Sequence, residues 1–293
     1  MLIGIIPNTT KENIIDVVGN IAEKFSEQKI DIVLSDTLLK FKDKFNTVLN
    51  NQKYMPEETI FANSEIVVSI GGDGTMLNTA YHSLDKDVPI IGVNFGKLGF
   101  LAEYDINDIE KFIKDIKNKN YFIEERIVLE AYCTKEPNEK FFAINDIVIE
   151  KGEWPKMIEQ SIYVDDKYVT SFLADGLIIA TPTGSTGYSL SVGGPIVCPN
   201  TDVITISPIS AHSLTMRPIV LSSVNEIKVI AKSQHKNVQL SFDGQRVKAV
   251  SSPIELVIKR SSKNIKLLHT QSINYFEVLR KKLLWGLDVR NNN

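Results

Sequence analysis

Residues 66–77 read IVVSIGGDGTML, an apolar run that stops at three glycines placed around a single acid, Asp73. A buried strand followed by glycines and a helix is the arrangement at which α/β sheets bind ligands. Glycines let a phosphate approach the main chain, where the N–H groups of the helix N-terminus point at the anion. This stretch therefore predicts a parallel α/β sheet with an anion-binding loop at residues 71–75.

Asp73 is unexpected in such a loop, because a carboxylate beside bound phosphates is repelled unless a metal ion or a chemical role compensates it. A base at this position can take the proton of an attacking hydroxyl while Mg²⁺ neutralises the phosphates. The alternative is an ordinary turn in which Asp73 caps the helix. A Walker A string is absent, and Leu77 stands where a GxGxxG loop needs its third glycine.

The first half of the chain alternates short apolar runs with helical patterns. The expected strands are 2–6, 30–34, 66–70 and 88–93, and the expected helices are 11–28, 76–84 and 106–119. Strands that are apolar on both faces and separated by helices are typical of a parallel sheet covered on two sides. The Lys-rich residues 35–60 are expected to form a solvated connection rather than core.

After residue 121, apolar or alternating runs recur at short intervals with almost no helix between them. They are residues 127–133, 141–149, 161–164, 169–172, 176–180, 202–206, 226–231, 238–242 and 254–258. Such a series predicts an all-β domain. We expect an N-terminal α/β domain over residues 1–122 and a C-terminal β-sandwich-like domain over residues 123–273. A helix over 274–287 is expected to pack back on the first domain, and residues 164–167 to form a plain hairpin turn.

Composition and charge limit the function. The 293 residues are 43% hydrophobic and 24% charged, with a formal net charge of -3, so the positive field that carries nucleic-acid binding is missing. The N-terminal residues do not resemble a signal peptide, and no apolar run approaches the length of a membrane span. With only Cys133 and Cys198, a disulfide scaffold is not expected. We expect a cytoplasmic protein that binds neither nucleic acid nor membrane.

Three further stretches carry polar groups where a core or a plain loop would not need them. Residues 181–191 gather six hydroxyls and one aromatic ring, which suits a polyhydroxylated ligand with a flat ring, such as a nucleoside. The alternative is a loop whose hydroxyls bond its own backbone, with Tyr188 as a core anchor. Asn145 and Asp146 interrupt an apolar strand and need either a bulge or a ligand. Asp243-Gly244 fits an ordinary hairpin turn at least as well as a site.

Five strings taken together resemble the NAD kinase family across the whole chain. They are IGGDGTML at 70–77, ND at 145–146, DGLIIATPTGSTGYSLSVGGPIV at 175–197, HSLTMRPIV at 212–220 and SFDGQ at 241–245. The GGDGT loop alone also resembles diacylglycerol and sphingosine kinases and, more loosely, phosphofructokinases. The string at 175–197 distinguishes the NAD kinases.

The resemblance implies transfer of the γ-phosphoryl group of ATP, or of polyphosphate, to the 2′-hydroxyl of the adenosine ribose of NAD, with a divalent metal such as Mg²⁺. Asp73 matches the proton acceptor of the family, and no metal ligand is expected from protein side chains. The residues expected near the donor phosphates are Gly71, Gly72, Gly74 and Thr75. The residues expected to bind NAD are Gly74, Asn145, Asp146, Lys156, Asp175, Thr186, Gly187, Tyr188, Ser191 and Gln245.

The sequence departs from the family pattern at three positions. Asp146 stands where Glu is commoner, and Gly187 replaces the usual Ala. Leu173 stands where some relatives have Arg, and Lys156 is a candidate to supply the missing charge.

Two other functions stay open at this stage: a non-catalytic NADP(H)-binding sensor with the same fold, and a lipid kinase of the diacylglycerol type. Under the NAD kinase interpretation the partners are NAD and ATP. The expected assembly is a homodimer or homotetramer, because exposed edge strands invite pairing.

Overall fold

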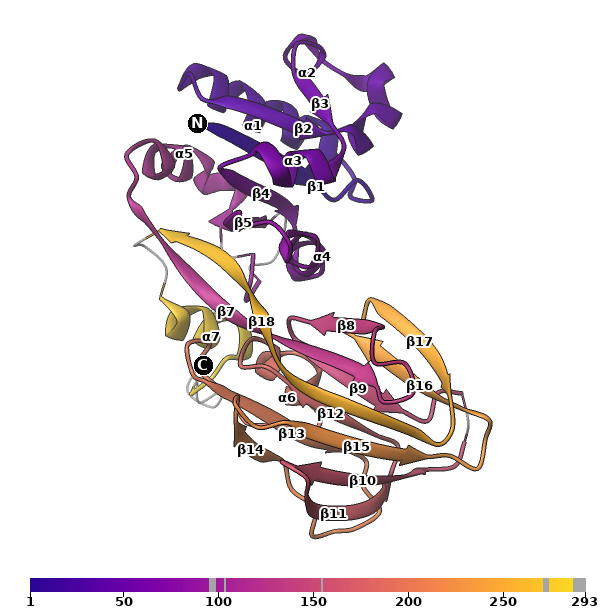
Figure 1. The fold of residues 1–293 in the computed structure, drawn as a ribbon. Coiled ribbons are helices and arrows are strands. Elements are labelled where there is room, and N and C mark those ends of the chain that lie inside the picture. Colours follow the sequence, from indigo (N-terminus) through magenta and orange to yellow (C-terminus); the bar gives the residue numbers. More distant parts are fainter. Residues whose placement is uncertain (95–98, 103, 154, 271–273, 287–293) are drawn as a thin grey trace, which may run out of the picture. The chain divides into compact units, whose positions relative to one another are not determined.

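The protein is described by a computed structural model, which covers residues 1–94, 99–102, 104–153, 155–270 and 274–286. The chain separates into two compact units (Figure 1): unit 1 comprises residues 1–124 and 266–293, and unit 2 comprises residues 125–265. The backbone leaves unit 1 within strand β7 (Tyr121–Cys133) and returns within strand β18 (Ile254–Thr270). Each unit has its own hydrophobic core.

Unit 1 is built on a parallel sheet with the strand order β3-β2-β1-β4-β5. These strands are β1 (Leu2–Pro7), β2 (Asp31–Ser35), β3 (Lys53–Met55), β4 (Ile66–Gly71) and β5 (Ile90–Asn94). β5 also pairs in parallel with β6 (Tyr104–Asp105) and with the end of β18. Every residue of β4 is buried, because β4 has a strand on each side and lies in the middle of the sheet.

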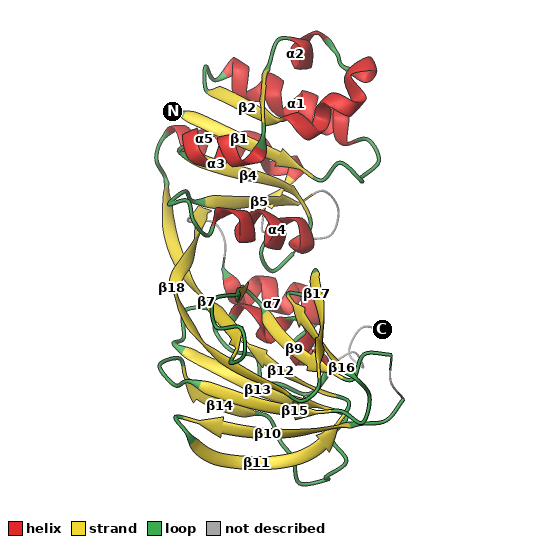
Figure 2. Cartoon of the chain, turned by 45° about the vertical axis from the view of Figure 1, so that its right-hand side comes forward, coloured by secondary structure: helices red, strands yellow, loops and turns green. Residues whose placement is uncertain are grey.

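Helices cover both faces of this sheet (Figure 2), as the alternation of side chains along β1 shows. Ile3 and Ile5 belong to the core that also contains residues of α1 (Ile14–Glu27) and α5 (Ile109–Lys117). Gly4, between them, faces Ile60 of α3 (Glu57–Asn63): a Cβ at Gly4 would lie 2.2 Å from Cγ2 of Ile60. The remaining helical segments of unit 1 are η1 (Asp36–Lys44), α2 (Thr47–Asn50), α4 (Asp73–Ser83), η2 (Ile106–Asp108) and α7 (Tyr275–Leu283).

The expectation that residues 35–60 form a solvated connection is wrong. Leu38 and Leu49 are at most 1% exposed and belong to the core of unit 1, and β3 extends the sheet. Lys40, Lys42 and Lys44 are exposed on η1, and Lys53 is exposed at the start of β3, so the average composition of the segment concealed its buried aliphatic residues.

Unit 2 consists of two sheets with a common core between them. The first sheet contains β11 (Lys167–Ala174), β10 (Ile158–Val164), β15 (Ile227–Lys232), β18, β7 and β8 (Lys140–Ala143). The second runs in the order β14 (Ile219–Ser222), β13 (Val203–Ile209), β12 (Gly176–Ala180), β9 (Asp146–Glu150), β16 (Asn237–Phe242) and β17 (Arg246–Ser251). Two short helices, η3 (Thr183–Thr186) and α6 (Tyr188–Ser191), follow β12.

The predicted fold class is confirmed: a parallel α/β unit is joined to an all-β unit. The plain hairpin at residues 164–167 is also confirmed, with Asp165 and Asp166 at φ 48° and 60° between β10 and β11. The predicted strand 141–149 is in fact two strands, β8 and β9, which belong to different sheets. The sequence analysis missed β14 and β17. Within the described residues, no helix combines the length and the apolar character needed to cross a membrane.

Candidate active site

The loop between β4 and α4 is compact, and its first glycine cannot carry a side chain. A Cβ at Gly71 would lie 2.3 Å from Oγ1 of Thr75, whereas a Cβ at Gly72 would meet nothing within 4 Å. Gly72 is the N-cap of α4, and its carbonyl accepts hydrogen bonds from the N–H groups of Thr75 and Met76. The strand therefore turns directly into the helix, whose N-terminus is left open toward an anion.

Asp73 is the first residue of α4, but its carboxylate does not cap that helix. Oδ2 accepts the N–H of Phe100 at 2.9 Å, and Oδ1 accepts the N–H groups of Leu101 and Ala102, each at 3.0 Å. Gly99 makes this approach feasible, because a Cβ there would lie 1.9 Å from Oδ1 of Asp73. The capping alternative is therefore wrong. A carboxylate has about four acceptor positions, so three amide donors leave room for a substrate hydroxyl.

Asn8 also positions this loop, and the sequence analysis did not single it out. Its Nδ2 donates to Oγ1 of Thr75 at 3.0 Å, while its Oδ1 accepts the N–H of Thr10 at 3.0 Å. Asn8 directly follows β1, the strand beside β4. The signal that could have identified it is the rule that polar residues at the carboxyl ends of neighbouring parallel strands come together.

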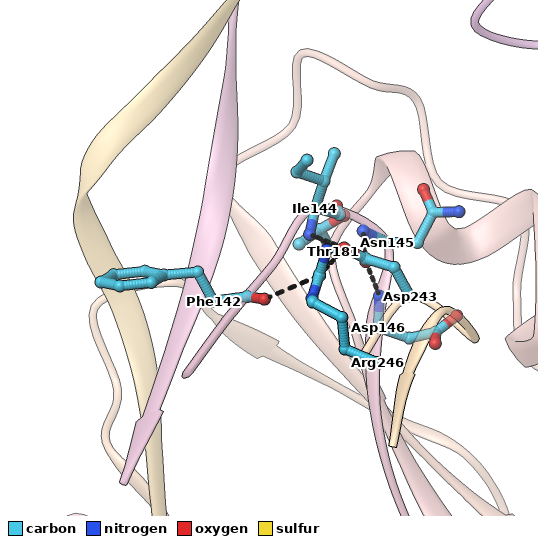
Figure 3. Close-up of polar contacts among 7 residues, drawn as sticks. All are labelled: Phe142, Ile144, Asn145, Asp146, Thr181, Asp243 and Arg246. Atoms are coloured by element: carbon cyan, nitrogen blue, oxygen red, sulfur yellow. Dashed lines mark hydrogen bonds and ion pairs between the residues drawn. The ribbon is translucent and has the colours of Figure 1, made fainter. Parts of the chain in front are cut away.

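Asn145 and Asp146 lie in unit 2, where the chain passes from β8 in the first sheet to β9 in the second. Figure 3 shows the backbone around them held by Asp243 and Thr181. Thr181 donates its hydroxyl to the carbonyl of Ile144 at 2.6 Å, and its N–H donates to the carbonyl of Asn145 at 2.9 Å. The polar pair therefore interrupts the apolar run because the chain changes sheets there.

The side chains of this pair have oxygen atoms free for a ligand. Oδ1 of Asn145 is buried and has no hydrogen-bond partner among the described residues. Asp146 is only 4% exposed, and burial first, then the charge of Asp243, raises its pKa to about 7. Both side chains lie beside Gly187, whose Cβ position is 3.7 Å from Nδ2 of Asn145 and 3.8 Å from Oδ2 of Asp146.

The raised pKa of Asp146 predicts a specific pH dependence of stability. A carboxyl whose pKa rises on folding stabilises the protein fully below its unfolded pKa near 4 and loses that contribution as pH rises through about 7. An asparagine does not ionise, so the Asp146→Asn variant does not lose this stability as pH rises. We expect the variant to be more stable than the wild type at pH 8, by on the order of 3 kcal/mol, and to show no such gain at pH 4.5 in urea unfolding.

A matched control for this prediction is Asp165→Asn. The pKa of Asp165 is lowered, first by its hydrogen bond from the Glu226 backbone, so this variant should gain no stability at pH 8. The same pH profile for both variants would contradict the assignment to Asp146.

The hydroxyl-rich loop 181–191 serves mainly as a framework. The Ser185 hydroxyl donates to the carbonyls of Pro182 and Val197, and the hydroxyls of Thr186 and Ser191 donate to carbonyls one turn back. Self-bonding of the loop is thus correct for Ser185, Thr186 and Ser191, whereas the hydroxyls of Thr181 and Ser189 bond to Ile144 and Ser207 outside the loop. The second part of that alternative is wrong: Tyr188 is 45% exposed and is not a core anchor.

Tyr188 instead presents its ring within a group of acids. Burial is the largest cause that raises the pKa of the Tyr188 phenol, and the negative charges of Glu150, Asp146 and Asp175 raise it further. Asp175 forms an ion pair with Lys151, with 2.7 Å between Nζ and Oδ1. Lys151 was not predicted, although a lysine next to Glu150 at the end of a strand was a visible signal.

The other predicted residues lie as follows. Gln245 is exposed in the turn after Asp243. Lys156 is exposed as well, and its Nζ donates to Oε1 of Gln234 at 3.3 Å rather than to another predicted site residue. The predicted phosphate loop, residues 71–75, belongs to unit 1, and all other predicted site residues belong to unit 2. Among the described residues, no three His, Cys, Asp or Glu side chains gather as metal ligands.

Comparison with solved structures identifies the class of this fold. The chain shares the fold of yeast NADH kinase complexed with NADH, with a TM-score of 0.90, 24% identity, and coverage of 100% of this chain and 90% of that chain. It is also similar to an NAD kinase from Archaeoglobus fulgidus in complex with ATP, with a TM-score of 0.76, 27% identity, and coverage of 97% and 99%. The two units thus define the fold of the kinases that act on nicotinamide dinucleotides.

Sequence comparison gives the family. Residues 3–121 match the ATP-NAD kinase N-terminal domain, and residues 144–270 match the ATP-NAD kinase C-terminal domain. The chain is 39% identical over 290 residues to an NAD kinase of Chlorobium phaeovibrioides, covering 99% of this chain and 100% of that protein. It is 41% identical over 282 residues to an NAD kinase of Clostridium botulinum, covering 96% and 95%. This chain belongs to the ATP-NAD kinase family.

Proposed function

We propose that this protein transfers the γ-phosphoryl group of ATP to the 2′-hydroxyl of the adenosine ribose of NAD, which yields NADP and ADP. The observation that carries the proposal is the Asn145–Asp146 pair, whose oxygen atoms are left without protein partners among the described residues, beside an exposed tyrosine ring in the unit that matches the family's C-terminal domain. A ribose supplies hydroxyls for such oxygens, and an adjoining base supplies a face for the ring.

In this proposal unit 1 binds the phosphates of the donor. The main chain at Gly71, Gly72, Gly74 and Thr75 and the N-terminus of α4 supply N–H donors and the positive end of the helix dipole. Mg²⁺ in such sites is commonly held in part by the phosphates of the substrate, so ATP would carry this ion into the site. The bound ion would neutralise charge on the transferred group.

Unit 2 binds the acceptor. Asn145 and Asp146 bind ribose hydroxyls, and the ring of Tyr188 packs against a base. The family resemblance extends the set of contacts to Gly74, Lys156, Asp175, Thr186, Gly187, Ser191 and Gln245. Of these residues, Asp175 already forms an ion pair with the side chain of Lys151.

Asp73 acts as the general base. Its remaining acceptor position takes the proton of the 2′-hydroxyl while the oxygen forms a bond to the γ-phosphorus and the bond from that phosphorus to ADP breaks. The chemistry therefore requires the acceptor hydroxyl to come within hydrogen-bonding reach of this carboxylate.

The direct test is an assay of the purified protein with NAD and Mg-ATP, in which NADP is measured by a dehydrogenase specific for NADP. Parallel reactions replace ATP by polyphosphate, NAD by NADH, and NAD by diacylglycerol in micelles. Formation of NADP above the blank supports the proposal. Tight binding of NADP(H) without product would indicate a non-catalytic sensor, and phosphorylation of the lipid alone would indicate a lipid kinase.

We also propose a cytoplasmic protein that assembles as a homodimer or homotetramer. The edge strands β11 and β14 of unit 2 expose apolar side chains, among them Tyr168, Val169, Leu173, Ile219 and Val220. Exposed edge strands of this kind favour pairing with another chain. Light scattering after size-exclusion chromatography should give two or four times 32.9 kDa, and a monomer at micromolar concentration would contradict the assembly.

A further inference from the structure

Asp243 lies in the turn between β16 and β17, and its side chain is fully buried. Its backbone adopts a left-handed conformation with φ of 56°, followed by Gly244 at 65°. The N–H of Gln245 donates to the carbonyl of Phe242 at 3.1 Å, which closes a hairpin turn around Asp243 and Gly244, but a hairpin turn needs no buried carboxylate. A buried charge is costly unless it is paired and hydrogen-bonded, so the partners of Asp243 show what its burial accomplishes.

The partners of the carboxylate are three consecutive backbone N–H groups and one guanidinium. Oδ1 accepts the N–H groups of Ile144 at 2.9 Å, Asn145 at 2.6 Å and Asp146 at 3.3 Å. Oδ2 is 2.7 Å from Nη2 of Arg246, and the same nitrogen donates to the carbonyl of Phe142 at 3.1 Å (Figure 3). All four backbone groups lie at the end of β8, in the segment that connects it to β9, or at the start of β9.

Three donors directed at one acceptor cannot come from a regular strand, because successive N–H groups of a strand point in alternating directions. The carboxylate therefore fixes an irregular backbone at Ile144–Asp146. The reverse bond, from the N–H of Asp243 to the carbonyl of Asp146 at 2.9 Å, ties the turn to the same segment. Thr181 fixes the carbonyls of Ile144 and Asn145 from a different strand end.

The result of this bonding is that two polar side chains face the loop at Gly187. With its backbone groups bonded to Asp243 and Thr181, the segment directs Asn145 and Asp146 toward Gly187, and their side-chain oxygens keep no protein partner among the described residues. We propose that Asp243, held by Arg246, is a positioning residue that presents Asn145 and Asp146 to the ribose of the acceptor nucleotide. This inference rests on the proposed function.

The test is Asp243→Asn in the full-length protein. The amide oxygen can still accept the three N–H groups, but the side chain loses its negative charge and turns an NH2 group toward Arg246 in place of the ion pair, so the Ile144–Asp146 segment should loosen. We expect the KM for NAD and the dissociation constant for NAD, measured by calorimetry, to rise about tenfold or more, with the KM for ATP changed less than about twofold. Hydrogen exchange of the amides at 144–146 should become faster. Arg246→Gln should change the same quantities in the same direction, but less.

The matched control is Asp165→Asn. Asp165 also has a positive φ, 48°, in a hairpin turn, and its carboxylate also accepts a backbone N–H from another segment, that of Glu226 at 3.0 Å. Asn145 and Asp146 do not depend on it, so its loss should leave both KM values and the exchange at 144–146 unchanged.

The outcomes separate this inference from the proposed function. If the wild type binds NAD but Asp243→Asn binds it equally well, or if both KM values rise together in that variant, Asp243 has a purely structural role and the inference is wrong. If the wild type neither binds NAD nor forms NADP, the proposed function fails. In that case, unchanged hydrogen exchange of the amides at 144–146 in Asp243→Asn would also refute the role of Asp243 in positioning this segment. Faster exchange would support that role, with an acceptor other than NAD.

Discussion

Asp73→Asn is expected to lower the turnover of NAD phosphorylation by about 10³-fold while the protein still binds NAD and ATP. The amide is nearly the same size as the carboxylate but cannot accept the proton of the 2′-hydroxyl. The oxygen of the new amide can keep the N–H groups of Leu101 and Ala102, whereas its NH2 group loses the bond from Phe100. The measurements are single-turnover kinetics and calorimetric titration with each nucleotide.

The position of Asp73 makes a control essential, because the carboxylate also anchors residues 100–102. Asp105→Asn is a matched change in the same unit: Asp105 accepts the backbone N–H of Asn107 at 2.8 Å and has no proposed chemical role. It should turn over at the wild-type rate. If Asp73→Asn loses thermal stability and ATP affinity in proportion to turnover, the carboxylate serves only to hold the loop, and its role as the base is wrong.

Gly184→Ala is expected to be the most damaging small substitution in unit 2. A Cβ there would lie 2.1 Å from the carbonyl oxygen of Asn145 and 2.5 Å from its carbonyl carbon. Both are backbone atoms, so neither can turn aside as a flexible side chain would. Either the η3 turn or the Asn145 segment must move. We expect a loss of about 3 kcal/mol in stability by urea unfolding, and a loss of NAD affinity of about tenfold or more.

Gly187→Ala is the matched control for stability in the same loop. Its Cβ would lie 3.2 Å from the carbonyl oxygen of Gly184, a tight contact but a much smaller clash than the one at Gly184. The free energy of unfolding should change by less than about 0.5 kcal/mol. Equal destabilisation by the two substitutions would show that the close approach of Gly184 to Asn145 does not matter.

The sequence alone determined the parts of this protein that carry a local pattern. Strands β1, β2, β4 and β5 of unit 1 were predictable because central strands of a parallel sheet are apolar on both faces. The glycine turn from β4 into α4 was predictable because glycines follow such a strand directly. The polar pair Asn145–Asp146 was recognisable because buried polar side chains in an apolar strand need hydrogen-bond partners. By contrast, the edge strand β14 was missed because it is only 4 residues long, and β17 because polar residues interrupt its apolar residues and none of them is buried.

Only the tertiary structure decided what holds the site in place. Asp73 is bonded to amides 27 to 29 residues away, and Asp243 to amides 97 to 99 residues away. Neither partnership leaves a period or a spacing in the sequence, because a carboxylate can accept N–H groups from any segment that the fold brings near it. For the same reason the sequence predicted only a hairpin turn at Asp243-Gly244. That prediction is correct, but the amides that Asp243 binds are brought to it by the fold.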